Sequence, residues 1–384
     1  MLLLLSPDQE SLRDTTARYL GDKVPPTVLR QLRDHPDGFT EEYWRQGVQL
    51  GWTHLLVGEE QGGGSVSGEG IVDLALLGHE FGRHAAPGPL LVNALVAGVL
   101  AGAGNHQQIV DGLLAGTRRA TWAPLDGPRQ DELGDVRLTV RVEGPELVLD
   151  GEKRPVESAS SSTHVLVTGL AEAGPTQVLV PLDAPGVEVT PLHSVDLTRR
   201  FDRVRFTAVR VDAAAAIGPI GGAAAELERQ LQWALVVSNA ESVGAMQVAF
   251  DMTLEWVFDR YSFGRPLASY QAIKHRMAAM KTWLEASHAI ADESAAAVAA
   301  AAPEAGKLTS AAAAYIGERG SELLQECVQF HGGIGVTFEH DLHLYLRRHT
   351  LNRTLHGTPA EHRRRVAVAL ATDAGTGTGI GDAA

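Results

Sequence analysis

The sequence predicts an α+β protein built from an N-terminal helical domain, a middle antiparallel β-domain and a C-terminal helical bundle. Three observations support this prediction. Residues 1–118 contain segments with helical periodicity that are separated by polar, glycine-rich breaks. Residues 119–221 instead contain short segments rich in Val and Thr, bounded by Gly, Pro or Asp. Residues 222–373 form long helical stretches, which usually assemble into a bundle.

Composition narrows the class of protein. The chain has 384 residues, enough for two or three domains, with 44% hydrophobic and 21% charged residues. A net charge of −14 argues against binding nucleic acid. The single cysteine, Cys327, excludes an intramolecular disulfide and a cysteine-cluster metal site, and it suits a reducing cytoplasm. We therefore expect a cytoplasmic protein.

The N-terminal part begins with a helix signal at Ser6, in "SPDQESLRDTTARYL". Further helices are expected in "EEYWRQGVQLG", "GIVDLALLGHEFGRHA" and "QQIVDGLLAG". The start "MLLLL" lacks the basic residues and the long apolar run of a secretory signal. The apolar stretch 90–104 is too short, and too interrupted by glycine, to span a bilayer. No membrane association is expected.

The middle part contains seven candidate strands, including "ELVLDG", "THVLVTG" and "TQVLVPL". Several of them alternate with period two, which is typical of an antiparallel sheet with one solvated face. In the last part, helices are expected at 223–260, 269–302, 304–330 and 340–355, followed by "PAEHRRRVAVALA". Residues 374–384 are expected to be a disordered tail.

One carboxylate interrupts an apolar helix face. Within "SNAESVGAMQVAF", Glu241 shares a face with Ala234, Val237, Gly244 and Val248. An unpaired buried carboxylate costs several kcal/mol, so such a group is usually paired or has a raised pKa. Glu241 is therefore either a paired structural charge or a working base.

Two later segments could contact a ligand. In "RYSFGRPLASYQ", Arg260 adjoins a tight turn, where a guanidinium can grip a diphosphate or simply end a helix. In "VQFHGGIG", paired glycines allow close approach of a ligand to the backbone. His340 and His343 in the following stretch are more simply explained as part of a solvated helix face, and no metal site is expected.

Together these two segments resemble the acyl-CoA dehydrogenases, flavoenzymes that desaturate acyl thioesters. The family's Arg–x–x–Phe–Gly and later Gln are matched by Arg260, Phe263, Gly264 and Gln271. Its Gln–x–x–Gly–Gly–x–Gly is matched by Gln329, Gly332, Gly333 and Gly335. The resemblance spans the whole chain and implies a C-terminal four-helix bundle.

The resemblance also implies FAD as cofactor, with its ring between sheet and bundle and its nucleotide end reaching a neighbouring subunit. The cofactor-binding residues would be Arg260, Ser262, Phe263, Gln271, Gln329, Gly332 and Gly333. It implies a dimer or tetramer, an acyl-CoA substrate and electron-transfer flavoprotein as electron acceptor.

Both usual positions of the family's catalytic base are changed. His356 in "LHGT" replaces the usual glutamate, and Ala234 stands at the alternative position. Glu241 lies seven residues, or about 10 Å of helix rise, from Ala234 on the same face, so we take it as the candidate base. A paired structural role for Glu241 remains open, as does a base at Glu157, Glu339, Asp341 or His356.

The flavin-side motifs depart from the family as well. "PLDGPRQDELGD" and "KRPVESASSS" replace the usual loops, with Pro155 at a tryptophan position and Glu157 at a hydroxyl position. The chain thus resembles a bacterial subgroup with an atypical base and degenerate flavin-side loops. The leading hypothesis is FAD-dependent formation of trans-2-enoyl-CoA. The alternatives are a non-catalytic partner subunit in a heterotetramer, or a different biosynthetic oxidation on the same fold.

Overall fold

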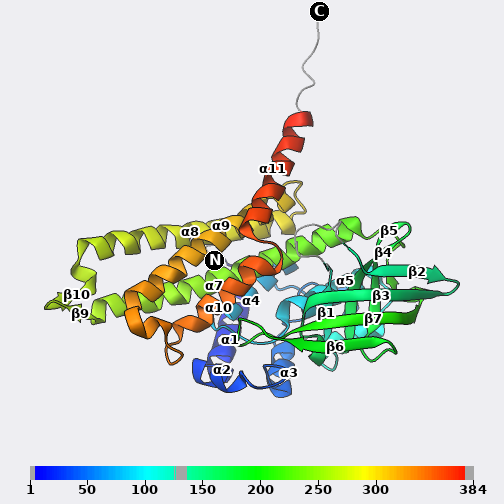
Figure 1. Cartoon of the computed structure of the whole chain (residues 1–384), viewed down its shortest axis with the longest axis horizontal. Helices are drawn as coiled ribbons and strands as arrows, with labels where there is room; N and C mark the ends of the chain where they lie inside the picture. The colour runs from blue at the N-terminus through cyan, green and yellow to red at the C-terminus, as the bar shows by residue number, and fades with distance from the viewer. Residues whose placement is uncertain (1–4, 125, 127–135, 377–384) are drawn as a thin grey trace, which may run out of the picture.

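The computed structural model describes residues 5–124, 126 and 136–376. Helices α1 to α6 form the N-terminal part, an eight-stranded sheet follows, and long helices complete the chain (Figure 1). The sheet lies at one end of the long helices and the β9–β10 hairpin at the other (Figure 1). The predicted order of helical, sheet and helical parts is confirmed.

The N-terminal helices pack around an apolar core. Ser6 caps the first helix through a capping box with Gln9, as the sequence signal predicts. The stretch that begins at Leu90 is a helix buried on nearly all sides, which explains why it is apolar all round. None of the helices among the described residues is long and apolar enough to cross a membrane. The helices are α1 (Pro7–Lys23), α2 (Pro26–Leu32), α3 (Glu41–Gln49), α4 (Gly70–Arg83), α5 (Leu90–Ala103) and α6 (Gln107–Leu114).

The middle sheet is mixed, which corrects the antiparallel prediction. Strands β1 and β2 each pair with β4 in parallel, whereas the other pairs are antiparallel. The strand order is β6-β7-β3-β2-β4-β5-β8, with β1 alongside β4. Local periodicity could not reveal the parallel pairs, because strand direction depends on how distant segments meet. The strands are β1 (Ala120–Ala123), β2 (Thr139–Glu143), β3 (Glu146–Glu157), β4 (His164–Ala171), β5 (Gly174–Pro181), β6 (Val187–Leu192), β7 (Phe201–Asp212) and β8 (Ala216–Ile217).

The C-terminal helices begin and end close to the predicted residues. They are α7 (Ala224–Asp259), α8 (Gln271–Ala299), α9 (Ala305–His331), α10 (Leu342–Leu355) and α11 (Pro359–Thr376), with β9 (Tyr261–Ser262) and β10 (Arg265–Pro266) forming a hairpin after α7. Helices α7 to α10 form the bundle, and α11 projects away from the body (Figure 1). Helix α11 continues through Thr376, past the predicted start of the disordered tail. Residues 377–384 lie outside the described residues.

Candidate functional site

Glu241 lies where α7 crosses α4 with the two backbones almost in contact. A Cβ atom added to Gly82 of α4 would lie 1.9 Å from the carbonyl oxygen of Glu241. A Cβ added to Gly244 of α7 would lie 2.1 Å from the carbonyl oxygen of His79. Only glycine permits such a close crossing of the helices. The crossing places Glu241, a residue that is 8% exposed, in the middle of the molecule.

Both carboxylate oxygens of Glu241 accept hydrogen bonds. Its Oε1 lies 2.5 Å from Nη1 of Arg348. Its Oε2 accepts from Nδ2 of Asn352 at 2.8 Å and from Nη1 of Arg199 at 3.3 Å. The carboxylate is therefore paired with two guanidinium groups, as buried charges normally are. These contacts favour the structural alternative for Glu241 over the role of a base.

Arg348 connects three parts of the molecule. Its guanidinium is fully buried on α10, with Nε 2.5 Å from Asp196 of the β6–β7 loop. Its Nη2 donates to the carbonyl oxygens of Ala85, at 3.2 Å, and Ala86, at 2.9 Å, just after α4. Burial would raise the pKa of Asp196, but Arg348 and the backbone N–H of Thr198 hold this pKa below its ordinary value. The N-terminal helices, the sheet and the bundle thus meet at one buried cation.

Arg199 extends the network toward the sheet. It pairs with Glu157 at the end of β3 through Nε at 2.8 Å and through Nη2, and it donates to Asn352 at 2.9 Å. Burial would lower the pKa of Arg199, but Glu157 and Glu241 raise this pKa above its ordinary value. The network therefore consists of two arginines held between three carboxylates, those of Glu157, Asp196 and Glu241.

A small cavity adjoins the network. Its volume is about 20 Å³, and Glu157, Arg199 and Glu241 face it together with mainly apolar residues. The remaining lining residues are Gly78, Phe81, Gly88, Leu90, Leu91 and Val237. Three charged side chains thus face a mainly apolar space that is large enough for about one water molecule.

Side chains at the junction of sheet and bundle contact one another directly. Trp122 of β1 donates from Nε1 to Gln230 of α7 at 2.8 Å, and Gln177 of β5 donates to the same oxygen at 2.7 Å. The ring of His356, at the position of the family's usual base, lies 5.9 Å from that of Trp122. Burial, with Arg199 and His362 nearby, lowers the pKa of His356 to about 3, so its imidazole is neutral at pH 7. Of the predicted flavin-side loop, residues 125 and 127–135 lie outside the described residues.

The predicted cofactor-binding residues gather at the opposite end of α7. Arg260 follows the last residue of α7, and Phe263 at the tip of the β9–β10 hairpin is 99% exposed. The end of α9 lies beside them, because Trp256 donates from Nε1 to the carbonyl oxygen of Phe330 at 3.0 Å. We call this surface the Arg260 platform; it consists of Arg260, Ser262, Phe263, Gln271, Gln329, Gly332 and Gly333.

The Arg260 platform has the chemistry to bind a diphosphate. Arg260 is exposed, and among the described residues it has no ion-pair partner. Nothing lies within 4 Å of a Cβ atom added to Gly332 or Gly333, so a ligand can approach the backbone there. A guanidinium without an ion-pair partner, beside glycine backbone that a ligand can approach closely, fits a dianion. The residues of this platform therefore fit the nucleotide end of FAD.

The platform and the sheet–bundle junction lie far apart in one chain. Gln230 and Arg260 are separated by 30 residues, and nearly all of this span is the helix α7, which gives about 45 Å of rise. The two ends are also well separated in Figure 1. A dinucleotide bound at this chain's junction therefore does not reach this chain's platform.

The same three-part architecture occurs in known proteins. The family model described as acyl-CoA dehydrogenase, N-terminal domain, matches residues 6–112, and the one described as acyl-CoA dehydrogenase, C-terminal domain, matches residues 222–371. The chain belongs to the acyl-CoA dehydrogenase family. Its members are flavoprotein oxidoreductases of lipid metabolism.

One relative and two solved structures are similar to this chain over most of its length. Acyl-CoA dehydrogenase IpdE2 of Mycolicibacterium smegmatis is 28% identical over 365 residues, which cover 94% of this chain and 98% of that protein. A variant of the Tcur3481-Tcur3483 steroid ACAD has a TM-score of 0.86 and 26% identity, covering 96% of this chain and 99% of that one. The ChsE4-ChsE5 complex of Mycobacterium tuberculosis shares the fold. Its TM-score is 0.86 at 24% identity, and the match covers 97% of this chain and 99% of that one.

Sequence reasoning identified Glu241 but missed its partners. Arg199, Arg348 and Asn352 lie 42, 107 and 111 residues from it. One signal was present: paired arginines occur in "LTRRF" and "LYLRRH", and a buried carboxylate calls for a cation. In this chain, the second arginine of "LYLRRH" (Arg348) and the first of "LTRRF" (Arg199) are the ones whose side chains are buried beside Glu241.

Proposed function

We propose that this chain is one subunit of an oligomeric FAD-dependent acyl-CoA dehydrogenase that converts an acyl-CoA to its trans-2-enoyl-CoA. The observation that carries the proposal is the position of the Arg260 platform. It lies about 45 Å along α7 from the chain's own junction of sheet and bundle, and it is open to solvent. The platform therefore serves a dinucleotide held mainly by a neighbouring subunit.

Each part of the platform has its own task in this proposal. Arg260 supplies a bidentate cation for the diphosphate, and the backbone at Gly332 and Gly333 lies open for close approach. Phe263 presents an exposed aromatic ring beside them. When bound, FAD supplies the acceptor for the hydride that leaves the β-carbon. We take electron-transfer flavoprotein as the electron acceptor of the oligomer.

The α-proton of the substrate needs a base, and the contacts of Glu241 favour a base on a partner subunit. A base must direct a free oxygen at the α-carbon, within hydrogen-bond reach. Both oxygens of Glu241 are instead held, by Arg348, Arg199 and Asn352. The Tcur3481-Tcur3483 steroid ACAD and the ChsE4-ChsE5 complex each have two named components, which supports assembly of this chain with a second family member.

A second candidate keeps the whole reaction in this chain, with Glu241 as the base. The observation that favours it is the cavity, because Glu241 faces this space of about 20 Å³ beside apolar residues. A substrate entering there would have to enlarge the cavity and separate Glu241 from at least one arginine.

Replacing Arg260 tests the platform. We expect Arg260→Gln to weaken FAD binding about tenfold, because one charge-assisted contact to the diphosphate is lost. FAD affinity and flavin content are measured on the chain purified alone and after co-expression with a second family member. The matched control is Arg265→Gln on the same hairpin, where the guanidinium lies 3.8 Å from the ring centre of Tyr270. Unchanged FAD affinity in Arg260→Gln would refute the platform's role.

Replacing Glu241 distinguishes a base on a partner subunit from Glu241 as the base. If a partner supplies the base, Glu241→Gln lowers the stability of the protein but leaves the rate of flavin reduction by acyl-CoA within about tenfold of the wild type. Loss of the base itself would lower this rate by about 10²- to 10⁴-fold. The control is Asp196→Asn, which removes a charge from the same network without facing the cavity. We expect the two variants to behave alike. A rate loss confined to Glu241→Gln would establish Glu241 as the base instead.

A further inference from the structure

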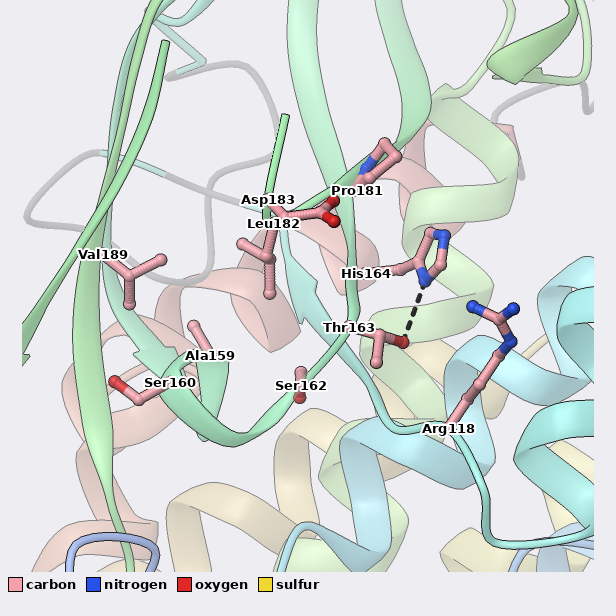
Figure 2. A pocket seen from close by; sticks show the side chains of 10 residues that line it. All are labelled: Arg118, Ala159, Ser160, Ser162, Thr163, His164, Pro181, Leu182, Asp183 and Val189. Carbon is pink, nitrogen blue, oxygen red and sulfur yellow. Dashed lines mark hydrogen bonds between the residues drawn. The ribbon is translucent and has the colours of Figure 1, made fainter. Parts of the chain in front are cut away.

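A groove opens on the sheet, at the N-terminal ends of the parallel strands β1 and β4 (Figure 2). Its volume is about 540 Å³, which is in the usual range for small-molecule sites. The cavity beside Glu241 has a separate lining, so this groove is a different site. The lining residues are Arg118, Ala159, Ser160, Ser162, Thr163, His164, Pro181, Leu182, Asp183 and Val189.

Arg118 provides a positioned cation. A Cβ added to Gly112 of α6 would lie 2.5 Å from Cδ of Arg118, so the stem of the arginine packs where Gly112 has no side chain. Among the described residues, Arg118 has no ion-pair partner. A half-buried, unpaired guanidinium is a good donor for a phosphate or carboxylate. This arginine is therefore available to an anion.

His164 lies between Arg118 and Asp183 (Figure 2). Its Nδ1 is 2.9 Å from Oγ1 of Thr163, and that hydroxyl donates its own proton to the carbonyl oxygen of Arg119. The ring must then donate from Nδ1, which turns Nε2 into an acceptor on the neutral imidazole. Burial and Arg118 lower the pKa of His164 while Asp183 opposes them, so the neutral ring is favoured at pH 7.

The hydroxyl groups of the groove can accept hydrogen bonds but have no proton left to donate. Ser160 donates its proton to Asp202, and Ser162 donates to the carbonyl oxygen of Ser158 at 2.8 Å. Their oxygens keep lone pairs that can accept further hydrogen bonds, and Asp183 adds a carboxylate to the lining. A complementary ligand thus carries one anionic group for Arg118 and several hydroxyl donors elsewhere. Pro181, Leu182 and Val189 add an apolar surface on which a sugar ring can pack.

We propose that this groove binds a phosphate monoester of a polyhydroxylated group, such as a sugar phosphate. The phosphate contacts Arg118, and the hydroxyl groups donate to Asp183, the serine oxygens and Nε2 of His164. Calorimetry with ribose 5-phosphate, ribose and inorganic phosphate tests this arrangement on the full chain. We expect ribose 5-phosphate to bind with a Kd below about 1 mM and each fragment to bind at least about tenfold more weakly.

Single substitutions test whether ribose 5-phosphate binds in this groove or at another surface of the protein. We expect Arg118→Gln to weaken ribose 5-phosphate binding at least about tenfold, and Asp183→Asn to weaken it about threefold. The exposed Arg45 lies outside the groove, so Arg45→Gln is the matched control, and Arg260→Gln excludes binding at the platform. Melting temperatures show whether each variant is folded. Absence of saturable binding to the wild type, or equal binding by Arg118→Gln, overturns the proposal and leaves the proposed function untouched.

Discussion

Replacing Arg348 with methionine lowers the free energy of unfolding by about 3–5 kcal/mol, the cost typical of breaking a buried ion pair by removing one partner. Methionine fills part of the space but leaves Glu241 and Asp196 without their shared cation. The carbonyl oxygens of Ala85 and Ala86 also lose a donor. Urea denaturation of the wild type and of Arg348→Met measures the difference.

The neighbouring arginine is the control. Arg347 lies one residue earlier on α10 and donates to the carbonyl oxygen of Val195 at 3.0 Å, where the contact is open to solvent. Arg347→Met should therefore cost less than about 1 kcal/mol. If both variants lose the same free energy, the buried network contributes no more than a surface contact, and the description of Arg348 as the cation joining three parts of the molecule is wrong.

Adding a single methyl group at Gly244 should destabilise the fold by about 3 kcal/mol, at the upper end of the range for overpacked cores. The new Cβ would lie 2.1 Å from the carbonyl oxygen of His79 and 3.0 Å from the backbone nitrogen of Arg83. Both are backbone atoms, so the collision can be relieved only by moving α4 and α7 apart. That movement also displaces Glu241 from Arg348. Thermal and urea denaturation of Gly244→Ala measure the loss.

A glycine-to-alanine substitution at an exposed helix position should instead raise the stability of the protein. Gly102 lies in α5, is exposed, and has nothing within 4 Å of an added Cβ. Gly102→Ala should therefore stabilise the protein by about 0.5–1 kcal/mol, because alanine loses less backbone entropy in a helix. Equal stability of Gly244→Ala and the wild type would show that the α4–α7 crossing is looser than the geometry indicates.

Local patterns in the sequence predicted most of the helices and several functional candidates. Periodicity and proline placement located α7 to α10 to within a few residues, because helix formation depends on neighbours three and four positions away. The Ser6 cap and the apolar face around Glu241 were also visible in the sequence, and the family was recognisable from the Arg260 and Gly332 segments. Their proposed roles in binding FAD stay predictions.

The tertiary structure decided the direction of strand pairing and the ion-pair partners of Glu241. The parallel pairing of β1 and β4, which opens the groove at Arg118 and His164, joins segments 44 residues apart. The pairing of Glu241 with Arg199 and Arg348 depends on the chain folding back over 42 and 107 residues. The physical reason is that charge pairing and strand direction depend on distances in space. A sequence shows that a buried carboxylate needs a cation, but only the folded chain decides which arginine comes within reach.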